Sequence, residues 1–233
     1  MSSFAARNVL IVGASRGLGL EFVRQYRAEG ARVTATARSD DGLAAIAALG
    51  ARPLKLDVAD AASASGLAWQ IDGEGFDTVF HVAGVYGPRT TGLEPPTPAD
   101  FDAVMHANVL GVMRVLPQVA DALAPPVDGR AAARIGVVSS RMGSIALRAS
   151  TAGWLYRASK AAANSVMKDA SLALAGRALC AAFHPGWVRT EMGGAGADID
   201  PAESIAGMRR ALAALEPADT GSFLNYDGTP LAW

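Results

Sequence analysis

The chain has 233 residues, of which 51% are hydrophobic and 18% are charged, and its formal net charge at pH 7 is −1. This balance suits one globular domain with a large core, so we expect a single domain over residues 1–233. It excludes the basic stripe of a nucleic-acid-binding protein, and no apolar run approaches the roughly 20 residues of a membrane span. The N-terminal segment is unlike a signal peptide. A lone cysteine, Cys180, excludes an intrachain disulfide, and a reducing cytoplasm is the expected location.

Short apolar runs alternate with amphipathic segments along the chain. The first run, NVLIV at 8–12, is typical of a strand that is buried on both faces. Such alternation predicts an α/β Rossmann fold, a doubly wound parallel sheet of about seven strands with helices on both faces and a ligand site beyond the strands' C-terminal ends. We expect strands at 8–12, 31–38, 52–58, 77–84, 133–140, 178–184 and 221–226, and helices at 17–30, 43–50, 60–70, 99–123, 154–175 and 201–215.

A glycine-rich turn, GASRGLG at 13–19, joins the first expected strand to the first helix. Glycine lets the backbone approach a phosphate closely, and a helix N-terminus offers free N–H groups and partial positive charge. A plain tight turn is the alternative, but the position between strand and helix favours phosphate binding. The expected phosphate-binding residues are Gly13, Ser15, Arg16, Gly17, Leu18 and Gly19.

The end of the second expected strand indicates which dinucleotide would bind. Proteins that prefer NAD place an acidic residue there to hold the ribose 2′-hydroxyl, whereas this chain has Ala37 followed by Arg38. Arg38 and Arg16 could converge on a 2′-phosphate, because guanidinium groups bind phosphate bidentately. An ordinary surface arginine is the alternative interpretation of Arg38. We therefore expect NADP(H) as the cofactor.

Tyr156 and Lys160 lie one helical turn apart in WLYRASKAAA at 154–163. Residues at this spacing share one helix face, and a cation beside a phenol lowers its pKa. The pair therefore suits a proton donor, and two surface residues are the alternative.

Several stretches together resemble the short-chain dehydrogenase/reductase family over about residues 7–233. They are GASRGLG at 13–19, LDVAD at 56–60, AG at 83–84, HANVLG around Asn108, VVSSRMG around Ser140, YRASK at 156–160 and HPGWVRT at 184–190. The stretches SSRMGSI and FLNYDGTPLAW are most similar to the carbonyl-reductase branch that includes C-factor and sniffer proteins.

The resemblance implies catalytic roles for four residues. Tyr156 would give a proton to a carbonyl oxygen, and Lys160 would lower the phenol's pKa and hold the nicotinamide ribose. Ser140 would hydrogen-bond the carbonyl oxygen, although Ser139 and Ser144 stay open as alternatives. Asn108 would interrupt its helix and support a proton-relay water, which would explain a residue that is poor in mid-helix.

The resemblance also implies further cofactor contacts and an activity. Asp57 would hold the adenine ring, and the stretch from Pro185 to Thr190 would wrap the nicotinamide. The activity implied is NADP(H)-dependent reduction of an aldehyde or ketone. A redox-sensing or signalling protein of the C-factor type, with little turnover, is the alternative, and an epimerase is disfavoured by the short C-terminal portion. Besides the glycine turn and Arg38, the residues expected at the cofactor are Asp57, Val58, Ala83, Gly84, Tyr156, Lys160, Pro185, Gly186, Val188 and Thr190.

Two departures from the family pattern stand out. Val12 replaces a threonine, and His81 with Val82 replaces two asparagines. In the family these polar groups tie the first strand to the fourth. Because both partners are replaced by apolar residues at once, neither is left without a hydrogen-bond partner, and the exchange could cost little stability. We interpret His81, His106 and His184 as structural, because their spacing does not suit a metal site, and we expect no metal. Cys180 is expected to be a buried small hydrophobe.

The substrate segment, EMGGAGADID at 191–200, is short and rich in glycine, which predicts a small mobile lid. Trp154, Trp187 and Met192 are candidate apolar walls for a carbonyl compound with an apolar body. The helices at 99–123 and 154–175 have alanine-rich faces that could form a homodimer, and a monomer is the alternative.

Overall fold

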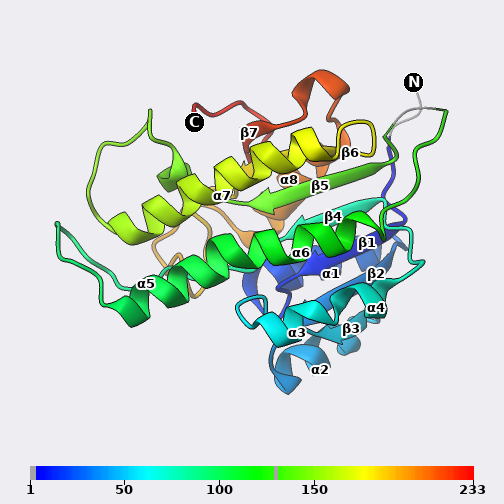
Figure 1. Cartoon of the computed structure of the whole chain (residues 1–233), viewed down its shortest axis with the longest axis horizontal. Coiled ribbons are helices and arrows are strands. Elements are labelled where there is room, and N and C mark those ends of the chain that lie inside the picture. The colour runs from blue at the N-terminus through cyan, green and yellow to red at the C-terminus, as the bar shows by residue number, and fades with distance from the viewer. Residues whose placement is uncertain (1–3, 129–130) are drawn as a thin grey trace.

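The computed structural model describes residues 4–128 and 131–233 (Figure 1). Its parallel sheet has the strand order β3-β2-β1-β4-β5-β6-β7, which confirms the predicted doubly wound fold. The strands are β1 (Asn8–Val12), β2 (Arg32–Ala37), β3 (Arg52–Lys55), β4 (Thr78–His81), β5 (Ala133–Val138), β6 (Ala178–His184) and β7 (Ser222–Asn225). The α-helices are α1 (Gly17–Ala28), α2 (Asp40–Ala48), α3 (Ala61–Ser65), α4 (Leu67–Ile71), α5 (Pro98–Met105), α6 (Gly111–Ala120), α7 (Trp154–Ala173) and α8 (Pro201–Ala213).

The central strand β1 contributes side chains to the hydrophobic core on both faces of the sheet. Its alternate side chains point to opposite faces of the sheet, so Leu10 and Val12 belong to one hydrophobic cluster and Val9 and Ile11 to the other. All five residues of β1 are buried, which explains why Val9–Val12 form a continuous apolar run.

Helices cover both faces of the sheet. Figure 1 shows α6 and α7 crossing one face side by side, and the two helices are in contact. On the other face α1 packs against α8, with Phe22 and Met208 fully buried. Among the described residues, none of the helices has both the length and the apolar character needed to cross a bilayer.

Two of the expected helices are interrupted. The segment near 60–70 forms two short helices, α3 and α4, which meet at Gly66. The long helix expected over 99–123 consists of α5, a π-helical turn at His106–Leu110 and α6. Such π-turns occur often at functional sites, and this one contains Asn108.

The C-terminal ends of β1 and β4 are held together by main-chain bonds. The carbonyl oxygen of Val12 accepts hydrogen bonds from the N–H groups of Val82, at 2.8 Å, and Ala83, at 3.0 Å. The Gly13 N–H donates to Thr36 Oγ1 at 3.0 Å, which ties the same point to β2. Val12 is fully buried and Val82 packs against the core. The apolar residues at these two positions therefore fit a junction that the backbone itself ties.

We expect Gly136→Ala to destabilise the fold, because a Cβ at this position of β5 would lie 2.5 Å from the Phe80 ring. Phe80 is fully buried and stacks on Phe22 with 4.1 Å between ring centroids, so the ring has little room to move. Overpacking of this kind costs about 1–3 kcal/mol, and urea unfolding measures it. The control is Gly66→Ala, where the nearest atom would be 3.7 Å away. A similar free energy of unfolding for the two variants would contradict the prediction.

Candidate active site

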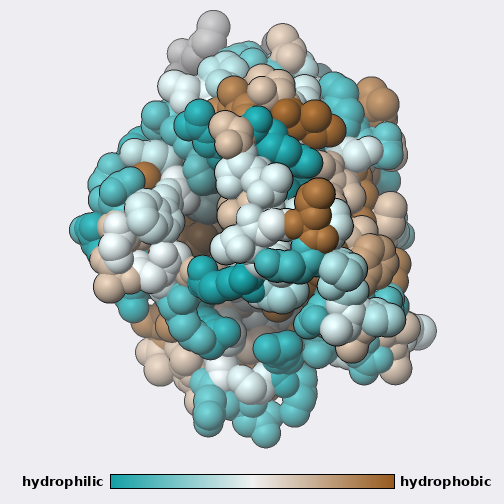
Figure 2. Space-filling model, turned by 90° about the vertical axis from the view of Figure 1, so that its left-hand side faces the viewer, coloured by the Kyte–Doolittle hydropathy of each residue, from teal (hydrophilic) through white to brown (hydrophobic). Residues whose placement is uncertain are grey.

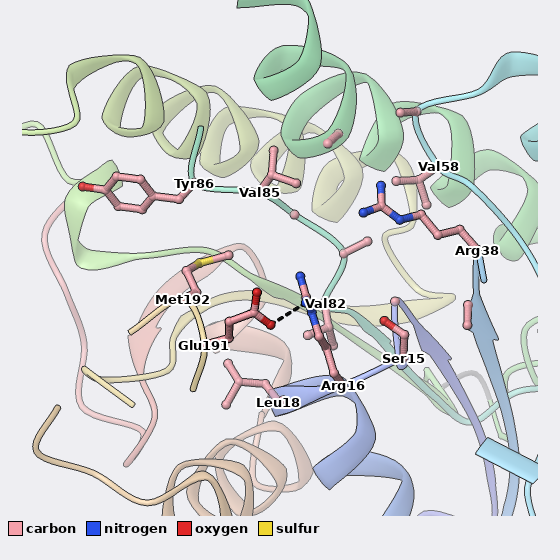
Figure 3. Close-up of a pocket in the computed structure, with 18 of the residues that line it drawn as sticks. Ser15, Arg16, Leu18, Arg38, Val58, Val82, Val85, Tyr86, Glu191 and Met192 are labelled. Carbon is pink, nitrogen blue, oxygen red and sulfur yellow. Dashed lines mark hydrogen bonds and ion pairs between the residues drawn. The ribbon is translucent and has the colours of Figure 1, made fainter. Parts of the chain in front are cut away.

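A cavity of about 530 Å³ lies beyond the C-terminal ends of β1, β2 and β4. Figure 2 shows that the molecule is hollowed on this side, and Figure 3 shows the cavity wall. The topology explains the location, because crossovers diverge to opposite faces where the strand order reverses, between β1 and β4. The residues that were predicted to bind cofactor and line this cavity are Gly13, Ser15, Arg16, Gly17, Leu18, Gly19, Arg38, Asp57, Val58, Ala83, Gly84 and Thr190.

The glycine turn has no space for a side chain at Gly13 or Gly19. Gly13 has φ +87°, and a Cβ there would lie 2.7 Å from the backbone of Ala83. A Cβ on Gly19 would lie 2.1 Å from the Gly13 carbonyl oxygen. Helix α1 begins at Gly17 with no side-chain cap, so its first N–H groups are available at the cavity. These features fit the pyrophosphate of a dinucleotide.

The two arginines expected at a 2′-phosphate lie apart in the structure. Arg38 extends from the end of β2 into the cavity beside Val58 (Figure 3). Arg16 instead forms an ion pair with Glu191 of the substrate segment, at an exposed position. Arg38 is therefore the better placed of the two for the phosphate.

Asp57 lines the cavity wall. Its carboxylate accepts a hydrogen bond from the Ala59 N–H at 3.0 Å, which fixes the orientation of the Asp57 side chain.

Tyr156, Ser140 and Lys160 form a buried group near the cavity. Their relative exposures are 7%, 8% and 5%, respectively. Lys160 Nζ donates to the carbonyl oxygen of Val138 at 2.9 Å and lies 5.7 Å from the centroid of the Tyr156 ring. Among the three candidate serines, Ser140 is the one close enough to the phenol to lower its pKa. Ser144 donates to the carbonyl oxygens of the last two residues instead.

The pKa of Tyr156 shifts in the direction opposite to that expected. Burial raises it to about 12, and the hydrogen bond with Ser140 opposes this shift only in part. Burial also lowers the pKa of Lys160 to about 8. The lowered pKa that was expected from Lys160 and a cationic nicotinamide ring is not found in the protein without cofactor, because burial disfavours the charged phenolate.

Asn108 joins the helix with the π-turn to the loop that follows β4. Its Oδ1 accepts from the Val85 N–H at 2.8 Å, and its Nδ2 donates to the Val85 carbonyl at 2.8 Å and to Ser159 Oγ at 2.9 Å. The helix is interrupted here as expected. The relay water that was predicted at Asn108 stays a prediction.

Burial keeps the two shifted histidines neutral. It lowers the pKa of His81 to about 3, with the Lys160 charge adding to the effect, and lowers that of His184 to about 4. Burial raises the pKa of the Cys180 thiol to about 12. These values agree with the interpretation of His81, His184 and Cys180 as structural residues.

The segment after β6 approaches the cavity only at its far end. Thr190, Glu191 and Met192 line the cavity. Pro185, Gly186 and Val188 lie outside the cavity lining, and Val188 is buried in a bridge with Ile199. Their contact with the nicotinamide stays a prediction.

Of the three candidate walls, Met192 alone lines the cavity among the described residues. The indole N–H groups of Trp187 and Trp154 donate to the carbonyl oxygens of Gly193 and Glu94, respectively. The two tryptophans therefore brace loops, and Trp187 fixes the start of the substrate segment.

The sequence analysis did not identify Tyr86 and Arg89. Both line the cavity, and the Tyr86 ring stacks on Tyr156 with 4.6 Å between centroids and 23° between planes. The available signal was the position of Tyr86 directly after the Ala83–Val85 stretch, where a sheet of this topology places its ligand.

Fold and site together define a dinucleotide-binding protein with a buried tyrosine and lysine. Residues 7–198 match the family model for short chain dehydrogenase. The chain belongs to the short-chain dehydrogenase family, so the predicted family and the broad class of oxidoreductase are confirmed.

Individual proteins show the same relationship. The C-signal protein of Myxococcus xanthus is 35% identical over 158 residues, which cover 67% of this chain and 92% of that protein. The structure of carbonyl reductase Sniffer of D. melanogaster has a TM-score of 0.84 at 28% identity, and the match covers 98% of this chain and 100% of that one. For the NADPH-bound carbonyl reductase from chicken fatty liver the TM-score is 0.85 at 28% identity, with 100% and 96% covered. The predicted likeness to this branch is confirmed.

Burial of Lys160 predicts a pH dependence of stability. The pKa falls from 10.5 in the unfolded chain to about 8 in the folded protein. Between these values the unfolded chain binds a proton that the folded protein has lost, so stability rises with pH in that window. Relative to Lys160→Met, the wild type should gain up to about 3 kcal/mol between pH 8 and pH 10.5.

Urea unfolding at several pH values measures this difference. The raised pKa values of Tyr26 and Tyr156 make the stability fall with pH above pH 10. Both proteins contain these tyrosines, so this effect cancels in the comparison. Lys55→Met removes an exposed ammonium that pairs with Asp40, and it controls for the loss of one charge. A constant difference between wild type and Lys160→Met across this window would show that Lys160 is not buried as a cation.

Proposed function

We propose that the protein is an NADP(H)-dependent reductase that converts an aldehyde or ketone into an alcohol. The observation that carries this proposal is the buried group of Tyr156, Ser140 and Lys160 beside a cavity whose glycine turn admits no side chain at Gly13 or Gly19. The likeness to an NADPH-bound carbonyl reductase over the whole chain supports the cofactor and the reaction class.

Different residues would bind the different parts of the NADP(H) cofactor. The turn that contains Gly13 and Gly19, together with the first N–H groups of α1, would hold the pyrophosphate. Arg38 would bind the 2′-phosphate, and Asp57 would face the adenine. When bound, reduced nicotinamide supplies a hydride for the carbonyl carbon.

Tyr156 would supply the proton. Its pKa of about 12 keeps the phenol protonated at neutral pH, as an acid in the reductive direction requires. Ser140, which lies near the phenol and lowers its pKa, would hold the substrate oxygen beside it. The Lys160 ammonium would stabilise the phenolate that remains after proton transfer.

A signalling protein that binds NADP(H) with little turnover is the second candidate. The 35% identity to C-signal over most of that protein favours it. The presence of both Tyr156 and Lys160 favours the reductase, because a sensor needs no proton donor. A reducing cytoplasm and a homodimer stay predictions from the sequence.

Replacement of Tyr156 by phenylalanine should abolish most of the turnover. General acid catalysis contributes about 10²- to 10⁴-fold, so kcat should fall by that factor while NADPH still binds. The measurement is NADPH absorbance against a panel of aldehydes, ketones and diketones, with fluorescence titration for binding. Tyr226→Phe is the control, because the Tyr226 hydroxyl bonds Glu203 and does not line the cavity. Turnover that survives in Tyr156→Phe would exclude the proposed acid.

Arg38→Leu should weaken NADPH binding selectively. A hydrogen bond to a charged group contributes about 1.5–3 kcal/mol, so the Kd for NADPH should rise roughly 10- to 150-fold. The Kd for NADH should stay nearly constant, since NADH has no 2′-phosphate. Arg16→Leu should have a smaller effect, because Arg16 is paired with Glu191. Equal losses for NADPH and NADH in Arg38→Leu would contradict the assignment.

A further inference from the structure

Tyr86 covers one face of the proposed acid. Its ring lies 4.6 Å from that of Tyr156, with 23° between the planes. The arrangement depends on Gly153, because a Cβ there would lie 2.4 Å from the Tyr86 hydroxyl oxygen. The start of α7 is therefore shaped to admit a second phenol ring beside Tyr156.

Arg89 also lies against the Tyr86 ring. Its guanidinium carbon is 4.9 Å from the centroid of that ring. Arg89 Nη2 also donates to the carbonyl oxygen of Met192 at 2.9 Å. The stack of Tyr156, Tyr86 and Arg89 thus continues into the substrate segment.

This arrangement limits how a substrate reaches the phenol hydroxyl of Tyr156. Tyr86 covers one face of the Tyr156 ring, so a carbonyl compound that reaches the phenol hydroxyl from this side lies along the edge of the Tyr86 ring. Figure 3 shows Tyr86 and Met192 at the same end of the cavity, away from Arg38. A flat molecule can lie against aromatic edges and the Met192 thioether, both of which interact favourably with an aromatic ring.

We propose that Tyr86 is a specificity-determining residue that favours flat aromatic or conjugated carbonyl compounds over saturated, puckered ones of the same size. The inference rests on the proposed reductase function and names its substrate class. Contacts between aromatic rings contribute about 0.5–1.5 kcal/mol beyond area burial, which sets the size of the expected preference.

The first experiment compares turnover of benzaldehyde and cyclohexanecarbaldehyde, which have the same number of carbons and differ in planarity. In Tyr86→Leu, the ratio of kcat/KM for the flat over the puckered aldehyde should fall about 2- to 13-fold. Tyr86→Phe should keep the ratio, because the ring remains. Trp69→Leu removes an aromatic ring from an exposed site on α4, and it should leave the ratio unchanged. An equal loss for both aldehydes in Tyr86→Leu would overturn the proposal.

The second experiment measures binding without chemistry, so that failure of this inference can be told from failure of the reductase proposal. Benzamide and cyclohexanecarboxamide carry a carbonyl group that nicotinamide does not reduce, and calorimetry gives their Kd values in NADP⁺-loaded protein. Benzamide should bind more tightly, and Tyr86→Leu should reduce that advantage by the same factor. This result without aldehyde turnover would reject the reductase and support the role of Tyr86. Equal affinities in the wild type, no binding of either amide, or an unchanged ratio in Tyr86→Leu would overturn the inference.

Discussion

The site depends on the close approach of two strand ends, where β1 and β4 separate into opposite crossovers. The Val12 carbonyl oxygen accepts two N–H groups from the end of β4, and Gly13 lies so close to Ala83 that a Cβ would be 2.7 Å from its backbone. A side chain at Gly13 would push the strands apart or fill the cradle. The apolar pair Val12 and Val82 is tolerated because the backbone itself makes the junction.

Burial, rather than charge pairing, sets the electrostatics of the candidate catalytic group. Lys160 and Tyr156 lie almost without solvent, and the desolvation of each disfavours its charged form. The Lys160 ammonium is held by the Val138 carbonyl and, among the residues that the structure describes, by no carboxylate. A cationic nicotinamide ring would enter a site where electric fields are weakly screened, so its effect on the phenol would be larger than in water.

Two arginines join the rim of the cavity to the substrate segment. Arg16, from the glycine turn, pairs with Glu191, and Arg89, from the loop after β4, binds the Met192 carbonyl. Two adjacent residues of the segment are thus held from different strand ends. Ion pairs as exposed as that of Arg16 and Glu191 contribute little stability, which agrees with the prediction that this segment is a mobile lid.

The sequence by itself determined the order of elements, the glycine cradle and the spacing of Tyr156 and Lys160. All three follow from local periodicity and steric rules that act over a few neighbouring residues. It could not reveal the stack of Tyr86 on Tyr156 or the pairing of Arg16 with Glu191. Nor could it give the direction of the Tyr156 pKa shift. These features depend on which segments, distant along the chain, pack together and exclude water, and only the tertiary structure decides that.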